Sequence, residues 1–90
     1  MRMTRRQEWD RVLTEELERW AAKPWPQVLA DIEDGNVAYE VIWDSKTYQV
    51  EADLLENIQE YLHVSIAVDD GSLPESICPA FRSFICKKAP

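Results

Sequence analysis

The sequence predicts a single α+β domain over residues 1–90, in which an N-terminal helix and a second, short helix pack on one face of an antiparallel β-meander of three to four strands. Three observations support this class: an apolar stripe with helical spacing opens the chain, apolar and polar residues alternate through its middle, and turn residues separate the alternating segments. A period of three to four residues is typical of an amphipathic helix, and a period of two is typical of a half-buried strand. Each apolar face needs a cover, so the helix and the sheet are expected to cover each other.

The first predicted element is a helix over residues 4–22. Thr4 and Gln7 fit a capping box, in which a hydroxyl and a side-chain amide each satisfy a free backbone N–H group at the helix start. A second helix is predicted over residues 26–34, because Pro26 suits a first turn and a glycine follows the last residue. The stripe of the first helix consists of Trp9, Val12, Leu13, Leu17, Trp20 and Ala21.

Strands are expected over residues 37–43, 47–54 and 61–68, each pairing with the next. Two consecutive leucines at the end of the second strand break its alternation and predict a bulge. Residues 81–87 are predicted to form a fourth strand, because Phe, Ile and Cys outnumber helix formers there, with a last short helix as the alternative. The apolar residues of the second strand are Tyr48, Val50, Ala52 and Leu54.

The register of the first two strands follows from matching their apolar faces. We predict that Trp43 lies opposite Tyr48, across a loop centred on Ser45 and Lys46. A slip by one residue would place apolar side chains opposite polar ones, so it is rejected. Ser-Lys is a poor pair for a tight two-residue turn of type I′, which favours a four-residue loop.

The charge of the chain is negative and unevenly distributed. The formal net charge is −7, and residues 24–77 hold twelve acidic residues but Lys46 as their single basic residue. Phosphates require a cationic surface, so this composition argues against nucleic-acid binding, and equally against anionic membranes. It suits a partner protein with a basic surface.

The compartment is inferred from the chain start and the two cysteines. Positive charges near residue 1 are not followed by an apolar segment, so no signal peptide is expected, and no apolar run approaches the ~20 residues that cross a bilayer. Cys78 and Cys86 lie too far apart for a disulfide on a continuous helix or strand, and a bridge would need a chain reversal near Pro79. We therefore expect reduced thiols in a cytoplasmic protein, and no zinc site.

One face of the predicted sheet is polar and lacks an intramolecular cover. The expected register places Glu40 opposite Glu51, and the third strand then places His63 beside Asp53 or Glu51. Paired carboxylates next to an imidazole are suited to acid–base work or to a divalent cation. No Gly-rich loop or cleft-forming motif accompanies them, so a solvated sheet face is the simpler interpretation. We expect no catalytic residue, no metal site and no cofactor.

A second group of candidate partner contacts lies around the short helix. Trp25, between two prolines, is a candidate surface anchor, whereas the other tryptophans are assigned to the core. Asp31, Glu33 and Asp34 are expected at the C-terminal end of this helix, where carboxylates oppose the helix dipole. A local rule broken in this way can mark a functional surface.

These observations favour a protein that acts by protein–protein contact, in the manner of an inhibitor, an immunity protein or a regulatory module, and not an enzyme. The alternative is a small ligand-binding or hydrolytic protein that uses the acidic sheet face. A homodimer is also expected, because an edge strand and an open face are usually protected. An edge contact through residues 81–85 is favoured over face-to-face stacking, which would oppose glutamates.

Overall fold

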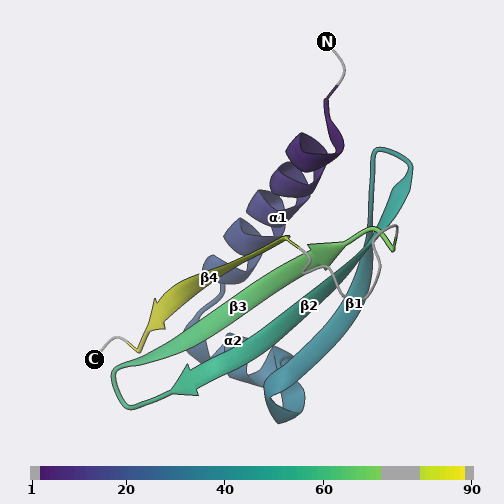
Figure 1. Cartoon of the computed structure of the whole chain (residues 1–90). Helices are drawn as coiled ribbons and strands as arrows, with labels where there is room; N and C mark the ends of the chain where they lie inside the picture. Colours follow the sequence, from purple (N-terminus) through teal and green to yellow (C-terminus); the bar gives the residue numbers. More distant parts are fainter. Residues whose placement is uncertain (1–2, 72–79, 89–90) are drawn as a thin grey trace.

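The computed structural model describes residues 3–71 and 80–88, and it places two helices on one face of a four-stranded antiparallel sheet (Figure 1). This confirms the α+β class. The sheet order is β1-β2-β3-β4, so each strand pairs with the next in sequence. The elements are α1 (Arg5–Ala21), α2 (Trp25–Asp31), the 3₁₀ helix η1 (Glu33–Gly35), β1 (Asn36–Trp43), β2 (Lys46–Asn57), β3 (Tyr61–Asp69) and β4 (Ala80–Lys87).

Helix α1 begins as the capping pattern predicts. The Thr4 hydroxyl accepts a hydrogen bond from the Gln7 backbone N–H at 3.2 Å, and the Gln7 side chain accepts one from the Thr4 N–H at 2.8 Å. The helix packs against β3 and β4. The core between helices and sheet consists of Trp9, Val12, Leu13, Trp20, Val28, Ile32, Tyr48, Val50, Ala52, Leu62, Val64, Ile66 and Val68.

The second helix is shorter than predicted. It ends at Asp31, and the following residues form η1, in which Asp34 has a φ of 55°. The predicted extension to residue 34 is therefore wrong. Ile32 is buried in the core, and the left-handed residue turns the chain toward β1 instead of continuing the helix.

The predicted register of β1 and β2 is wrong by two residues. Val41 lies opposite Tyr48, and Trp43 lies opposite Lys46. The turn contains two residues, Asp44 and Ser45, with φ values of 50° and 65°. Two consecutive positive φ values are the mark of a type I′ turn, whose twist matches that of the flanking strands. A shift of two residues keeps every side chain on its face, so the apolar pattern is the same in both registers.

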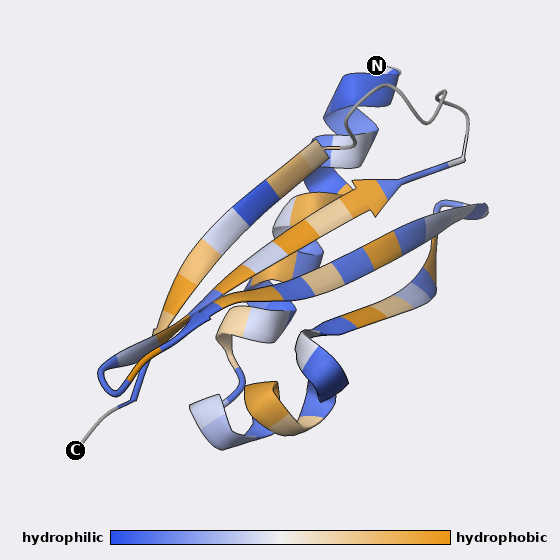
Figure 2. Ribbon diagram, turned by 60° about the horizontal axis from the view of Figure 1, so that its bottom comes forward, coloured by the Kyte–Doolittle hydropathy of each residue, from blue (hydrophilic) through white to orange (hydrophobic). Residues whose placement is uncertain are grey.

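The later part of the sheet agrees with the sequence. A register irregularity between Leu54 and Glu56 confirms the predicted bulge. β4 confirms the predicted fourth strand, with Phe84 opposite Val64 on β3. Figure 2 shows the alternation of hydrophobic and hydrophilic residues along the strands.

Candidate functional site

The side of the sheet opposite the two helices is uncovered by any described segment, and we call it the open face. In Figure 1 both helices lie behind the sheet, and the open face is toward the viewer. Alternate residues of each strand point there, away from the buried rows. Its acidic residues are Glu40, Glu51, Asp53, Glu56 and Asp69.

The two glutamates that were expected to face each other are separated. Glu40 lies opposite Gln49, whereas Glu51 lies between Ala38 on β1 and Ala67 on β3. The predicted Glu40–Glu51 pair is therefore wrong, because the two-residue turn moves β1 by two positions along β2. The sheet spreads these charges over neighbouring rows instead of concentrating them at one point.

His63 lies in a different row from the residues predicted beside it. It is opposite Glu56, and its Nδ1 is 3.6 Å from the Glu56 Oε1 atom. Asp53 instead lies opposite Ser65 on one side and Asn36 on the other, and the Asn36 amide donates a hydrogen bond to its carboxylate. The cause is the length of β2, which continues to Asn57 instead of ending at residue 54, so that Leu54 lies opposite Val64 and, after the bulge, Glu56 lies opposite His63.

Four basic residues of the described ranges pair with acids on the helix side of the molecule. Lys46 Nζ lies 2.7 Å from Glu8 on α1, and Lys23 Nζ lies 2.7 Å from Asp31. Two further pairs join Arg82 to Asp10, and Arg19 to Glu16. Among residues 3–71 and 80–88, neither Glu40 nor Glu51 has an ion-pair partner, so these two carboxylates of the open face are not neutralised by a neighbouring base.

A hollow of about 180 Å³ lies on the open face. Ala38 and Ala67 flank Glu51 in one row of the sheet, and their small side chains leave space between longer neighbours. Phe81 on β4 lies opposite Ala67 on β3, and Phe81 is 66 % exposed. The hollow is lined by Ala38, Gln49, Val50, Glu51, Ala67, Val68 and Asp69.

The candidate contacts around α2 are mostly engaged within the molecule. Trp25 is half-buried against the core, and the Lys88 ammonium lies 5.1 Å from its ring centroid. Asp31 accepts hydrogen bonds from Lys23 and Gln27, and these bonds hold the pKa of its carboxyl below the usual value. The remaining two, Glu33 and Asp34, are exposed in the 3₁₀ helix η1, beyond the end of α2.

Sequence reasoning missed a buried polar network between α1 and β1. Glu16 is only 3 % exposed, and its Oε1 accepts a hydrogen bond of 2.6 Å from the Tyr39 hydroxyl. The same hydroxyl accepts a bond of 2.7 Å from the Trp20 indole N–H. Burial, and then the hydrogen bond to Glu16, raise the pKa of Tyr39. A signal was present, because Glu16 lies within the apolar stripe, four residues from both Val12 and Trp20.

A cleft of about 330 Å³ adjoins this network, between the end of α1, α2 and β1. Its walls include the Tyr39 and Trp20 rings, and the Lys23 ammonium lies 3.9 Å from the Trp20 ring centroid. Lys23 is at the same time paired with Asp31. These polar groups therefore bind one another across the cleft.

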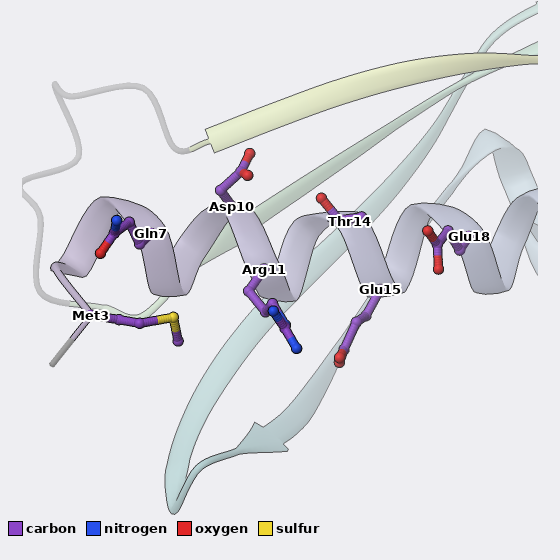
Figure 3. Close-up of a pocket in the computed structure, with 7 residues that line it drawn as sticks. All are labelled: Met3, Gln7, Asp10, Arg11, Thr14, Glu15 and Glu18. Carbon is purple, nitrogen blue, oxygen red and sulfur yellow. The ribbon is translucent and has the colours of Figure 1, made fainter. Parts of the chain in front are cut away.

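A larger groove of about 500 Å³ runs along α1, and Figure 3 shows the side chains that line it. Asp10 and Thr14 point toward β4, where both accept hydrogen bonds from Arg82, whereas Arg11 and Glu15 point to the other side. The charged residues of this groove are three acids, Asp10, Glu15 and Glu18, and one base, Arg11. It has no arrangement that suits catalysis.

Neither the search for metal sites and membrane spans in the described residues nor the comparison with known proteins assigns a function to the chain. In the described ranges, no three or more His, Cys, Asp or Glu residues are grouped to hold a metal ion, and no helix is long and apolar enough to cross a membrane. Cys86 is a free thiol on β4, while Cys78 lies outside the described residues. No family model matches the chain, and neither a curated protein nor a solved structure matches it.

Proposed function

We propose that this protein acts by contact, and that its open face binds the basic surface of a partner protein, in the manner of an inhibitor, an immunity protein or a regulatory module. The observation that carries the proposal is the distribution of ion pairs. The described ion pairs of Lys and Arg all join acids on the helix side, and Glu40 and Glu51 on the open face have no ion-pair partner among the described residues. Complementary charge of this kind steers association and selects partners.

The hollow on the open face supports the same proposal. Ligand pockets for small molecules usually span about 300–1,000 Å³, so a hollow of about 180 Å³ is too small for such a ligand and suits a single side chain. An arginine or lysine from the partner would lie over Ala38 and Ala67, with its charged group near Glu51 or Asp69. The exposed Phe81 ring would add a cation–π contact.

A cytoplasmic location is part of this proposal, and the free thiol of Cys86 supports it. The alternative, a ligand-binding or hydrolytic protein that uses Glu40, Glu51, Asp53 and His63, has less support. The register separates Glu40 from Glu51, and the continuation of β2 to Asn57 places His63 beside Glu56. A thermal-shift screen of divalent cations and small metabolites distinguishes the two functions, since saturating ligand stabilises the folded chain by mass action.

The binding proposal is tested with a labelled hexa-arginine peptide, followed by fluorescence anisotropy at low and high salt. Glu40→Gln with Glu51→Gln removes two charges from the open face. Glu33→Gln with Asp34→Asn removes two charges from η1 and is the matched control. The expected result is several-fold weaker binding for the first variant only. Equal weakening in both variants would show attraction to net charge alone and would contradict the proposal.

Self-association through β4 is a second proposal, which a separate observation favours. Phe81 and Ile85 are 66 % and 50 % exposed, and both point to the open face from a strand at the edge of the sheet. The open-face residues of β4 include no carboxylate, so two copies can approach there without the repulsion that face-to-face stacking would cause. Light scattering coupled to size exclusion tests it. A mass near 10.5 kDa at high micromolar concentration would exclude the dimer.

A further inference from the structure

We infer that the self-association proposed above has one defined register, in which β4 pairs antiparallel with β4 of a second copy and the two-fold axis passes beside Ser83. The inference rests on that proposed dimer. It specifies which residues meet, and therefore predicts more than an oligomeric state.

The position of β4 at the edge of the sheet favours pairing with another strand. β4 is the last strand of the order β1-β2-β3-β4, so the backbone groups along its outer side have no described strand partner. Such an edge is a template for another strand. The other edge, β1, presents Glu40 near the middle of its open-face row, where a second copy would bring like charges together. β4 is therefore the edge that suits a second copy.

The faces of the strand then limit the register. In β4, Phe81, Ser83, Ile85 and Lys87 point to the open face, and the residues between them point to the core. A pairing that opposes odd-numbered to even-numbered residues would place open-face side chains beside core-facing ones. The two-fold axis must therefore pass beside a residue, and not between two residues.

Three positions of the two-fold axis near the middle of β4 can be compared, namely beside Arg82, Ser83 or Phe84, and the first and last of these give poor contacts. An axis beside Arg82 would oppose two guanidinium groups. An axis beside Phe84 would pair Phe81 with Lys87 and Ile85 with Ser83, so neither exposed apolar side chain would gain an apolar neighbour.

An axis beside Ser83 gives a better match than either alternative. Phe81 of each copy then lies opposite Ile85 of the other, and the pair forms twice. Aromatic–β-branched pairs across antiparallel strands stabilise a sheet. On the core side Arg82 lies opposite Phe84 of the second copy. The two α1 helices would approach along the flank that carries Asp10 and Thr14, whose polar groups already bind Arg82 (Figure 3).

Disulfide trapping tests this register. Directly opposed residues of an antiparallel pair have Cα atoms about 4.5–5.5 Å apart, which is within disulfide range. Ser83→Cys, with Cys78→Ser and Cys86→Ala, is expected to form a covalent dimer in high yield on mild oxidation. Lys87→Cys in the same background is the control, because its two copies would lie about 26 Å apart at roughly 3.3 Å per residue.

Each outcome of this experiment has a defined meaning. Trapping at residue 83 and not at 87 supports the register. A dimer by light scattering that is trapped poorly at residue 83 overturns the register but leaves the self-association standing, and a monomer at high micromolar concentration overturns both. If the cysteine-free background fails to fold, Ser83→Cys in the otherwise native chain, with the 83–83 link identified by mass spectrometry, gives the same answer. Phe81→Asp should abolish the dimer, whereas Ile42→Asp on the opposite edge should not.

Discussion

The hydroxyl of Tyr39 on β1 donates a hydrogen bond of 2.6 Å to Glu16 on α1, a carboxylate that is only 3 % exposed. A polar group at that depth needs a hydrogen-bond partner, because burial without one is costly. The bond therefore links the longest helix to the first strand, across the gap between the two layers. It also shows how a polar residue is accommodated within an apolar stripe.

Removal of the Tyr39 hydroxyl should destabilise the fold. Tyr39→Phe leaves the buried carboxylate without its shortest hydrogen bond, and we expect a loss of about 1–3 kcal/mol in the free energy of unfolding, measured by urea denaturation. Tyr48→Phe is the matched control. Tyr48 is buried, and its hydroxyl has no hydrogen-bond partner among the described residues. Its removal should leave stability unchanged or raise it, and similar losses in both variants would contradict the role of the network.

Alkaline pH should weaken the fold through the same hydroxyl. Burial, followed by the bond to Glu16, raises the pKa of Tyr39 above the value of about 10 that tyrosine has in an unfolded chain. A pKa raised on folding contributes stability that is complete below pH ~10 and is lost as the pH rises through the folded value. Urea unfolding from pH 8 to 11 is expected to show this decline, with a shallower decline for Tyr39→Phe. Equal slopes would contradict the assignment.

The turn between β1 and β2 should improve with glycine. Ser45 has a φ of 65°, a left-handed conformation that costs a residue with a Cβ roughly 1–2 kcal/mol. Ser45→Gly is therefore expected to stabilise the chain by up to about 1 kcal/mol in urea unfolding. Ser65→Gly, within β3, should instead destabilise it, because glycine loses entropy in a strand. Stabilisation by both variants, or by neither, would count against the two-residue turn.

The sequence predicts the arrangement of helices and strands correctly, but it does not determine which residues of β1 and β2 lie opposite each other. Alternation along β2 and β3 fixes which side chains are buried, and the stripe of α1 fixes what covers them. Registers that differ by two residues bury the same side chains, so the apolar pattern cannot distinguish Val41 opposite Val50 from Val41 opposite Tyr48. The backbone of Asp44 and Ser45 decides between them, through a left-handed conformation that their identities only weakly favour.

For the candidate site, the sequence likewise predicts which face the residues occupy but not which residues are neighbours. The acidity of the open face follows from the alternation, and the structure keeps Glu40, Glu51, Asp53 and His63 on that face. Their neighbours depend on where the turns fall. The two-residue turn after β1 separates Glu40 from Glu51, and the continuation of β2 to Asn57 places His63 beyond Asp53. The ion pairs of the helix side join residues far apart in sequence, such as Asp10 and Arg82, and no local pattern reveals them.

A nuclear magnetic resonance titration of the ¹⁵N-labelled chain with hexa-arginine peptide tests most directly whether the open face is the binding surface. We expect the largest amide shifts to cluster around the hollow, at Gln49, Glu51, Ala67 and Asp69. Added salt, and the variant with both Glu40→Gln and Glu51→Gln, should suppress these shifts. Shifts that instead cluster on η1, at Glu33 and Asp34, or along the groove of α1 would contradict the proposal.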